Sequence, residues 1–493
     1  MRLSLKNEFS LYAVIVFFLA LYGWGANTNS TIDAWGYAAQ VASGKELFQP
    51  HHLLYNVLGY CWVNAINSVF NFDCLVLLKF LNAAFAVLCL LVLLNILRYI
   101  GIQKQTIFLL LILVGGSWGI MRFATENEAY VAPLLFSLLG SLFYHKGVKE
   151  NSTNFFVAGL LAAVATLFHQ VMFFWWFGLL LGLFYRRKIR ELTLYIFPAI
   201  AVPIIYSAVV YHLYGTFSIN LLFRFTFSDY YSGAANVGLG GKSILLLGIG
   251  IIRSFIQIHG YIIHLFAHSF WWWICGIMGI VMILLGKFWL IKKAKATVGS
   301  VFFFGVYSTI LILQAMFALL SDGNAEFLAM IPLLAAILLS LTQPISNRAL
   351  GFIASGMLIW NVTLGLIPLK YFTLDGSEMV VSHIRSNKTP GQSAYILHSV
   401  PRIENELNYI GLGGKPMLIK PTDLVNGLSD SIANLVKQGY AVYTDEYHRP
   451  ATLSRETIVG GDSLDNRVFD KFSKTPTDSV STITGWYYLY RIE

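Results

Sequence analysis

Long apolar runs, separated by short polar segments, make up most of the first 370 residues of the chain. Runs of about 20 apolar residues have the length that a helix needs to cross a bilayer. We therefore predict a polytopic, all-α membrane region with about 11 spans. The predicted spans are 9–25, 74–97, 106–121, 129–145, 155–169, 171–185, 192–213, 269–291, 299–320, 327–343 and 349–369.

Lysine and arginine gather in alternate loops between these runs. Short cytoplasmic loops carry an excess of such residues, so we place these loops in the cytoplasm, with the N-terminus inside and the C-terminus outside. The basic residues are Arg2, Lys6, Arg98, Lys104, Lys146, Lys149, Arg186, Arg187, Lys188, Arg190, Lys287, Lys292, Lys293, Lys295 and Arg348. The extracytoplasmic polar segments are then Asp33 to Asn67, Arg122 to Glu128, Gly215 to His268 and Ser321 to Glu326.

Two helices too short to span are predicted in the first of these segments. One begins at Asp33 and ends at Gly44, with an apolar face formed by Trp35, Ala38, Ala39 and Ala42. After a Pro50-His51-His52 corner, the second covers Leu53–Asn67, a length of about 22 Å against a hydrocarbon core of about 30 Å. We predict that both lie on the membrane surface.

Residues 244–268 are apolar enough to resemble another span, but a span here would place Lys287 to Lys295 on the wrong side. Polar residues recur in this segment every three or four positions, as a stripe along one helix would. The stripe is Arg253, Gln257, Tyr261, His264 and His268. We predict a third interfacial or cavity-lining helix; the alternative is an ordinary span with a polar packing face.

After residue 370 the pattern changes to short apolar runs of strand length, with one helix-like stretch at Ser429 to Gln438. We predict a small α/β extracytoplasmic domain over 371–493, following a transmembrane domain over 1–370. Gly411 to Gly414 has the spacing of neither a Walker nor a dinucleotide-binding loop, and we interpret it as a turn.

Composition supports this picture. Hydrophobic residues make up 57% of the chain and charged residues 12%, with a mean hydropathy of +0.65, which is more apolar surface than a soluble core can bury. The net charge of +9 comes mainly from short loops, without a long basic run interleaved with aromatic residues. We therefore predict no nucleic-acid partner.

Carboxylates in two extracytoplasmic segments are the candidate catalytic residues: Asp33, Glu126 and Glu128. Such groups are costly to keep at a membrane edge, and together they suggest a general base or a metal site. Each has a plainer alternative. Ser30 to Asp33 fits a capping box, and either glutamate is compatible with a solvated loop, so we assign a function to at most one of the two.

Histidines and basic residues supply candidates for binding. His51 and His52 are compatible with a metal site or with hydrogen bonds to an anionic substrate, and His169 with the same cavity or with packing. The guanidinium groups of Arg224 and Arg253 match the geometry of a phosphate. Lys242 is a further candidate, although snorkelling toward lipid head groups suits it equally.

With these residues the chain resembles the GT-C superfamily of membrane glycosyltransferases, particularly protein O-mannosyltransferases and lipid A aminoarabinose transferases. The similarity covers roughly residues 1–370. It rests on Asp33, the stretch GKELFQPHHLLYNVLGY, Glu126 or Glu128, the Arg224 loop and Asn324-Ala325-Glu326-Phe327. The chain departs from the family pattern in having Ala34-Trp35 after the aspartate and Phe327-Leu328 after the late acid.

The resemblance implies an inverting glycosyltransferase of the bacterial inner (cytoplasmic) membrane. The donor would be a polyprenyl-phosphate-linked sugar, and the acceptor a lipid, glycan or protein at the outer face; a divalent metal is a compatible cofactor. Asp33 would be the base, with Glu126 or Glu128 as the second acid. The substrate-binding candidates are His51, His52, Tyr55, His169, Arg224, Lys242, Arg253, His264 and Glu326. The alternative is a transporter or flippase of a lipid-linked or anionic solute, for which ionisable groups at mid-membrane are expected.

Overall fold

The computed structural model describes residues 2–232, 240–287, 298–342, 346–421, 427–447 and 466–493. By their contacts these residues form two compact units. Unit 1 comprises 1–26, 46–257 and 274–366, and unit 2 comprises 27–45, 258–273 and 367–493. Lys292, Lys293 and Lys295, like the last residues of the predicted spans 269–291 and 327–343, lie outside the described residues.

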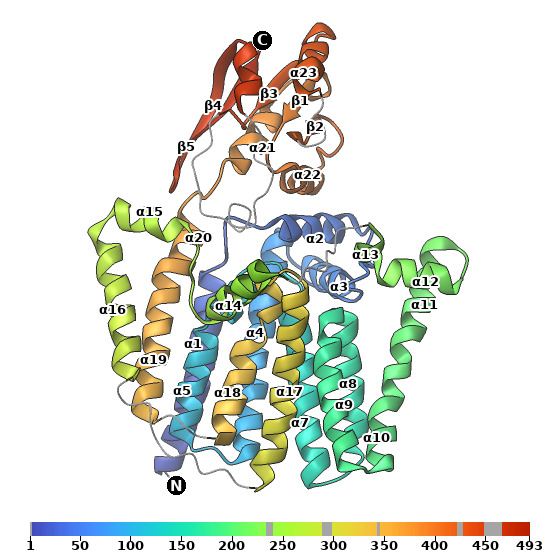
Figure 1. Ribbon diagram of the computed structural model, residues 1–493, viewed down its shortest axis with the longest axis vertical. Coiled ribbons are helices and arrows are strands. Elements are labelled where there is room, and N and C mark those ends of the chain that lie inside the picture. Colours follow the sequence, from blue (N-terminus) through green and yellow to red (C-terminus); the bar gives the residue numbers. More distant parts are fainter. Residues whose placement is uncertain (1, 233–239, 288–297, 343–345, 422–426, 448–465) are drawn as a thin grey trace. The chain divides into compact units, whose positions relative to one another are not determined.

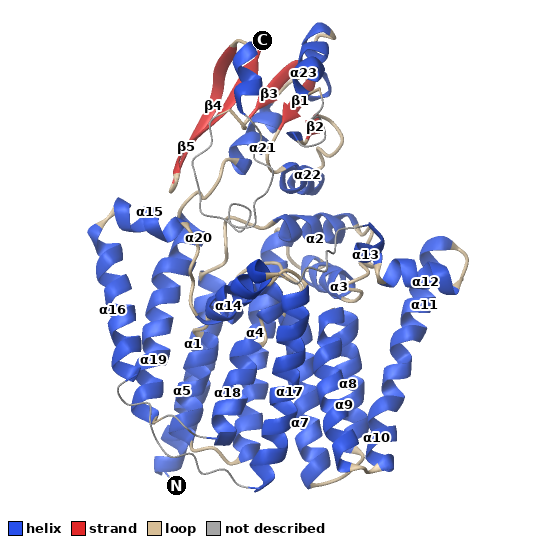
Figure 2. Ribbon diagram, in the orientation of Figure 1, coloured by secondary structure: helices blue, strands red, loops and turns tan. Residues whose placement is uncertain are grey.

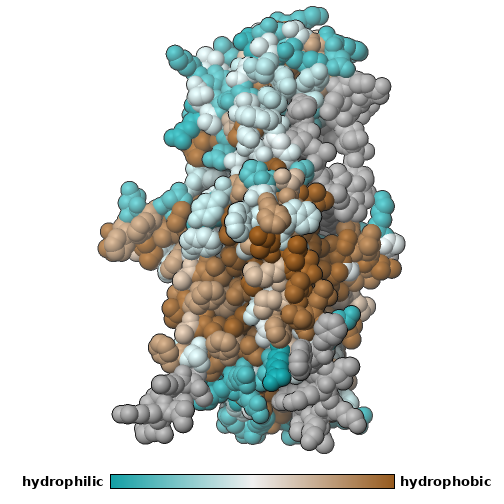
Figure 3. Space-filling view, turned by 90° about the vertical axis from the view of Figure 1, so that its left-hand side faces the viewer, coloured by the Kyte–Doolittle hydropathy of each residue, from teal (hydrophilic) through white to brown (hydrophobic). Residues whose placement is uncertain are grey.

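Unit 1 is a bundle of helices, many of which run side by side (Figures 1 and 2). Its helices are α1 (Arg2–Trp24), α3 (Tyr55–Asn67), α4 (Cys74–Ile100), α5 (Lys104–Gly115), α6 (Trp118–Ala124), α7 (Val131–Lys149), α8 (Asn154–Phe168), α9 (Phe173–Arg186), α10 (Ile189–Ile196), α11 (Ala201–Tyr214), α12 (Ile219–Thr226), α13 (Ser228–Ser232), α14 (Gly241–Phe255), α16 (Phe270–Lys287), α17 (Val298–Leu320), α18 (Ile331–Thr342) and α19 (Asn347–Asn361). On the face that Figure 3 shows, hydrophobic residues cover much of the described surface of the bundle.

Seven helical segments of the described residues are long and apolar enough to cross a membrane, and α5 with α6 makes an eighth if the bent pair is one span. Three shorter apolar helices, at Phe9–Trp24, Asn154–Phe168 and Gln170–Arg186, coincide with further predicted spans. The multi-pass membrane architecture is therefore confirmed. The number of about 11 spans stays a prediction.

The predicted span 106–121 contains a break, because α5 and α6 meet at an angle of 62°. At the break, Gly116 packs so closely that a Cβ there would lie 2.8 Å from the carbonyl oxygen of Ile112 and 3.2 Å from Leu358 Cβ. The side chain of Asn361 donates to the Gly116 carbonyl at 2.7 Å. A neighbouring helix thus satisfies the backbone group that the break releases.

The prediction of a single helix with a continuous polar stripe over 244–268 is wrong. Helix α14 ends at Phe255, Ile256 is extended (φ −131°, ψ 133°), and a separate helix α15 (Tyr261–His268) follows. Asn361 supports this break too, since it donates to the Phe255 carbonyl at 2.7 Å and accepts from the Gln257 N–H at 2.8 Å. Arg253 and His264 therefore belong to different helices, and the stripe is not continuous.

Unit 2 contains a five-stranded sheet in the order β2-β1-β3-β5-β4. The strands are β1 (Ser393–Ile396), β2 (Met417–Ile419), β3 (Ala441–Thr444), β4 (Lys474–Thr482) and β5 (Gly485–Ile492). Strands β1, β2 and β3 are parallel, whereas β5 pairs antiparallel with both β3 and β4. The α/β prediction for the C-terminal region is confirmed.

Helices cover both faces of this sheet. On one face, α21 (Ser377–Ser386) and α22 (Val400–Tyr409) pack around Tyr395 and Tyr443. On the other, α23 (Leu428–Lys437) packs around Ala394 and Val442. Alternate residues of the buried strands thus enter different cores, as the two-residue period of a strand requires. A further short helix, α20 (Ile367–Tyr371), belongs to the same unit.

Helix α2 (Ile32–Ser43) belongs to unit 2, where it packs against α22. The Trp35 ring lies 5.4 Å from that of Tyr409, and Asn405 Nδ2 donates to the Ile32 carbonyl at 3.0 Å. The buried residues of α2 are Ala34, Ala38 and Val41. Of the predicted apolar face, Trp35 contacts α22 and Ala38 is buried, whereas Ala39 is partly buried and Ala42 is exposed.

Candidate functional site

Two polar residues of α4 form the centre of the site in unit 1. Lys79 is 6% exposed and Asn82 is fully buried, although the rest of this part of the helix is apolar. Their spacing of three residues places them on the same face of the helix. A buried lysine needs an opposite charge or strong hydrogen bonds, because removing an ammonium group from water is costly.

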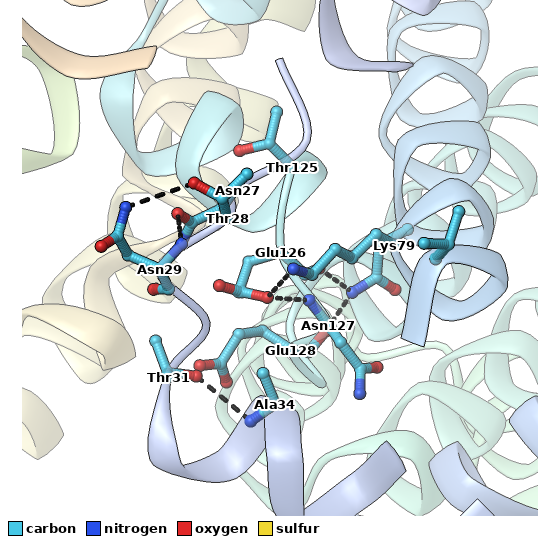
Figure 4. Close-up of polar contacts among 12 residues, drawn as sticks. Asn27, Thr28, Asn29, Thr31, Ala34, Lys79, Thr125, Glu126, Asn127 and Glu128 are labelled. Carbon is cyan, nitrogen blue, oxygen red and sulfur yellow. Dashed lines mark hydrogen bonds and ion pairs between the residues drawn. The ribbon is translucent and has the colours of Figure 1, made fainter. Parts of the chain in front are cut away.

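The partner of Lys79 lies in the short loop between α6 and α7. Lys79 Nζ lies 3.4 Å from Glu126 Oε1, and the same oxygen accepts the Asn127 N–H at 2.9 Å (Figure 4). Glu126 and Glu128 are 1% and 2% exposed. The alternative that these glutamates are solvated loop residues is therefore wrong.

Asn82 holds the backbone of the same loop. Its Nδ2 donates to the carbonyl oxygens of Glu126 at 2.7 Å and Glu128 at 2.8 Å, and lies 3.1 Å from the Tyr55 hydroxyl. Tyr55 in turn donates to Asn127 Oδ1 at 2.7 Å. Helices α3 and α4 thereby fix the acidic loop through a buried network, in which each polar group supports the next.

A second ion pair joins Arg122, at the end of α6, to Glu326. An Arg122 guanidinium nitrogen donates to Glu326 Oε1 at 2.9 Å, and the Tyr130 hydroxyl lies 3.3 Å from Oε2. The side chains are 19% and 29% exposed, so this pair is less buried than that of Lys79. Glu326, predicted to bind substrate, therefore has protein partners on both of its oxygens.

His51 lies in a polar cluster at the Pro50 corner. Its Nε2 lies 3.0 Å from Asp229 Oδ1 and 3.2 Å from the Ser228 hydroxyl, while its Nδ1 lies 3.3 Å from Gln170 Oε1. Gln170 also donates through Nε2 to the Pro50 carbonyl at 2.9 Å. The cluster links the Pro50 corner to the 3-10 turn Gln170–Met172, which precedes α9, and to the short helix α13.

His52 and His169 pack ring against ring, with centroids 4.4 Å apart, and Tyr130 lies 5.0 Å from His169. Burial, and then the neighbouring His51, lower the pKa of His52 to about 3. His169 Nδ1 accepts the Val171 N–H at 3.2 Å, so its proton is on Nε2. Among the described residues, this buried Nε2–H has no hydrogen-bond acceptor.

A metal centre does not fit these residues. Within the part of the chain that the structure describes, no three His, Cys, Asp or Glu side chains are grouped so that they would hold a metal ion. His51 contacts Asp229, and the His52 ring packs on His169, so the adjacent histidines have different surroundings. We therefore derive no chemical step through a metal.

Asp33 is the second residue of α2, in unit 2. Thr31 is the N-cap, and its hydroxyl accepts the Ala34 N–H at 3.2 Å. The N-cap is therefore Thr31 and not Ser30, and the residue three positions after it is Ala34, which has no side-chain acceptor to complete a capping box. Asn29 ties the start of the helix to α20, since its Nδ2 donates to the Leu369 carbonyl at 2.8 Å.

The remaining predicted residues lie on several helices. Arg224 is exposed on α12, Lys242 is exposed at the start of α14, and Arg253 is partly buried near its end. His264 is partly buried on α15, in unit 2. The structure thus brings Tyr55, Glu126 and Glu128 into one network, whereas Arg224, Lys242 and Arg253 lie on other helices, α12 and α14.

The residues that the sequence prediction missed are those that hold the acidic loop and the helix breaks: Lys79, Asn82, Arg122, Tyr130 and Asn361. Lys79 and Asn82 carried a signal, because they are the polar residues of LVLLKFLNAAF, three positions apart in an apolar span. A charged residue inside a span generally has a function or a specific partner. The contacts that Asn361 makes with two distant helix breaks left no local signal.

Comparisons with known proteins find similarity in structure alone. No protein-family model matches the chain, and no curated protein matches it by sequence. The oligosaccharyltransferase of Archaeoglobus fulgidus, solved with a tethered acceptor peptide that contains an NVT sequon, aligns over 97% of this chain and 74% of its own. The TM-score is 0.51 at 13% identity.

The arabinofuranosyltransferase AftD from Mycobacteria aligns over 98% of this chain but 40% of its own length, with a TM-score of 0.50 at 14% identity. ArnT from Cupriavidus metallidurans aligns over 97% of both chains at 12% identity, with a lower TM-score of 0.45. These proteins are glycosyltransferases of the GT-C superfamily. The chain is a multi-pass membrane protein with the GT-C fold, as its sequence pattern predicted.

Proposed function

We propose that this protein is a membrane glycosyltransferase that moves a sugar from a polyprenyl-phosphate carrier to a lipid, glycan or protein acceptor. The proposal rests on the GT-C fold together with the acidic loop around Glu126 and Glu128, which is buried and held by Lys79 and Asn82. The water-excluded carboxylates of this loop are suited to orienting hydroxyl groups, and the exposed carboxylate of Asp33 is suited to accepting a proton. A membrane-embedded enzyme with no recognisable nucleotide loop suits a donor that is itself a lipid.

In the proposed step, Asp33 accepts the proton of the acceptor nucleophile. The nucleophilic atom of the acceptor attacks the anomeric carbon of the donor sugar from the side opposite the phosphate. The new bond to the sugar forms as the bond from the anomeric carbon to the phosphate oxygen breaks, and the phosphate leaves with the electron pair. The configuration of the sugar is therefore inverted.

Charge develops on the leaving phosphate, and a guanidinium group stabilises such charge well. Arg253, which is partly buried on α14, is our candidate for this role, with the exposed Arg224 as the second choice. We also propose that residues 371–493 lie outside the cytoplasm, on the basis of the alternating basic loops. A reporter that is active only in the cytoplasm should be silent when fused after Glu493.

The experiment that tests the function uses the purified full-length protein and a radiolabelled polyprenyl-phosphate-sugar fraction from the source membrane. Asp33→Asn keeps the size of the side chain and removes the basic carboxylate, so transfer should fall by about a hundredfold or more while the protein stays folded. Asp73→Asn is the matched control, because Asp73 caps α4 through the Val76 N–H at 3.0 Å and asparagine can replace it as a cap.

Near-normal transfer by folded Asp33→Asn protein would show that another group is the base. If the wild-type protein instead moves the intact carrier across a vesicle membrane and transfers no sugar, the protein is a transporter and the proposed function is wrong.

A further inference from the structure

Helix α2, which carries Asp33, belongs to the same compact unit as the C-terminal α/β region. In this unit it packs against α22, one of the helices that cover the sheet (Figure 1). Asp33 itself is exposed on α2, so this packing does not bury its carboxylate. The candidate base is therefore accessible, while the helix that carries it is held by residues far away in the sequence.

The first contact lies just before the helix, at Asn29. Its Nδ2 donates to the carbonyl oxygens of Leu369 at 2.8 Å and Phe372 at 2.9 Å, and its Oδ1 accepts the Leu374 N–H at 3.0 Å. The Thr28 hydroxyl adds a hydrogen bond to the Leu369 carbonyl at 3.0 Å. The chain that leads into α2 is thus fixed to the start of the C-terminal region.

The second contact lies on the helix itself, at Asn405 of α22. Asn405 Nδ2 donates to the Ile32 carbonyl at 3.0 Å. Gly36 lies one turn after Ile32, and a Cβ added there would lie 2.9 Å from Asn405 Nδ2 and 3.4 Å from its Cγ. The absence of a side chain at Gly36 therefore allows the Asn405 amide to lie directly against the turn that contains Asp33.

We propose that Asn29 and Asn405 are positioning residues for Asp33, so that the C-terminal α/β region takes part in the chemical step by holding the helix that carries the base. This inference rests on the proposed function, because it concerns how Asp33 reaches the proton of the acceptor. A base must lie within hydrogen-bond reach of that proton, and a displacement of about 1 Å costs about a hundredfold in rate. Hydrogen bonds between neutral, partly exposed groups add little to stability, so their loss should affect placement more than folding.

The single-variant test uses the full-length protein and the radiolabelled polyprenyl-phosphate-sugar fraction. Asn29→Ala and Asn405→Ala should each lower kcat by about tenfold or more. Each should change KM for the carrier by less than about threefold, because neither residue touches the substrate.

Asn387→Ala is the matched control for Asn29→Ala. Asn387 also makes three side-chain hydrogen bonds within unit 2, to the hydroxyls of Ser393 and Tyr395 and from the Thr389 N–H. These partners are not connected to α2 by hydrogen bonds that the structure describes, so folded Asn387→Ala protein should keep the kcat of the wild type. Asn408→Ala, at an exposed position of α22, is the corresponding control for Asn405→Ala.

Gly36→Ala disturbs the same contact from the side of α2. Alanine favours a helix interior more than glycine does, so α2 itself should not be weakened, but the added methyl group displaces the Asn405 amide. The kcat should fall by about tenfold. The double variant Gly36→Ala with Asn405→Ala should be no slower than Asn405→Ala, since the amide that the methyl group displaces is then absent.

Combining Asn405→Ala with Asp33→Asn tests whether Asn405 acts through Asp33. The residual transfer of Asp33→Asn protein should change by less than about twofold when Asn405→Ala is added, because the group that Asn405 positions is already missing. A general loosening of unit 2 would instead lower the residual rate by the factor seen with Asp33 intact.

The inference is overturned, and the proposed function left standing, if folded Asn29→Ala and Asn405→Ala proteins have the kcat of the wild type. Equal losses in Asn387→Ala, or losses that multiply in either double variant, would have the same meaning. Near-normal transfer by Asp33→Asn would reject Asp33 as the base, and the inference with it. Absence of any sugar transfer by the wild-type protein would reject the proposed function itself.

Discussion

Glu126 in unit 1 and Glu406 in unit 2 are both buried glutamates, at 1% and 7% exposure, yet their electrostatic surroundings are opposite. Glu126 has a lysine 3.4 Å away and a backbone N–H on the same oxygen. Glu406 lies on α22 four residues after Arg402, whose guanidinium is ion-paired with Asp375. Among the described residues, no group donates a hydrogen bond to Glu406 Oε2.

The difference shows in the proton affinity of Glu406. Burial raises its pKa to about 7, against a weaker lowering by Arg402, and Glu378 and Asp375 raise it further. The comparison teaches that burial alone does not decide what a carboxylate does. A cation close to one of its oxygens makes it one half of an ion pair, whereas burial with a weaker cation and with neighbours of like charge makes it a group that binds a proton near neutral pH.

The largest effect should come from breaking the ion pair of unit 1. Glu126→Ala leaves Lys79 buried without its carboxylate, and the free energy of unfolding should fall by about 3–5 kcal/mol. Unfolding of the purified protein in detergent measures this loss. Glu404→Ala is the control, because Glu404 is exposed on α22 and should change stability by less than about 0.5 kcal/mol. A loss for Glu126→Ala as small as that of the control would mean that the pair contributes nothing to folding.

Removing the charge of Glu406 should raise the free energy of unfolding, whereas Glu126→Ala should lower it. The pKa of Glu406 is raised in the folded state from 4.5 to about 7, so the folded protein retains a proton that the unfolded chain releases. Stability therefore falls as the pH rises from about 4.5 to about 7, by on the order of 3 kcal/mol, and stays low above that window. Glu406→Gln should remove this dependence and stabilise the protein at pH 8.

Thermal unfolding between pH 4.5 and 8 checks this expectation. Glu404→Gln lies on the same helix, is exposed, and should keep the pH dependence of the wild type. If Glu406→Gln and the wild-type protein lose stability in parallel across the window, Glu406 is not the proton-binding group.

Arg402→Met tests the remaining favourable charge near Glu406. Because Arg402 lowers the pKa of Glu406, its removal should raise that pKa further, so the upper end of the pH window of decreasing stability should move upward while the lower end, set by the unfolded chain, stays near 4.5. The same thermal titration measures the shift. A window that stays in place would show that Asp375 already occupies Arg402 so fully that Glu406 does not sense its charge.

The N-cap of α2 gives an uncharged comparison in unit 2, and its expected effect on stability is smaller. Thr31→Ala removes the hydroxyl that accepts the Ala34 N–H, and stability should fall by about 1 kcal/mol. Thr31→Ser keeps the acceptor and should cost less than half as much. Equal losses for the two variants would mean that the methyl group of Thr31, rather than its cap hydrogen bond, stabilises this part of α2.

The sequence anticipated the elements whose pattern is local. Strands β1, β2, β3 and β5 follow the short apolar runs of the C-terminal region, and α23 follows the helical period. Strand β4 was missed because its sequence, KTPTDSVST, is polar. It lies at the edge of the sheet, where much of a strand remains exposed and the apolar signal is weak.

The predictions that failed involve contacts between distant segments. The polar stripe at 244–268 follows a regular helical period, yet the helix ends before Ile256. Asn361 stabilises this break, because it accepts a hydrogen bond from the Gln257 N–H and donates one to the Phe255 carbonyl. The same residue supports the break at Gly116. Periodicity describes which side chains would share a face, but it contains no information on a partner more than 100 residues away that makes a break stable.

The sequence by itself determined the membrane class, the positions of most apolar helices, the α/β character of the C-terminal region and the resemblance to the GT-C fold, because these follow from hydrophobic period and composition. Tertiary structure alone decided which polar groups meet. Lys79 was visible as a charge in an apolar run, but its pairing with Glu126, the hold of Asn82 on the loop and the opposite surroundings of Glu406 come from helices packed side by side. Electrostatic and hydrogen-bond energies depend on distances of a few ångströms across such packing, and sequence spacing does not contain those distances.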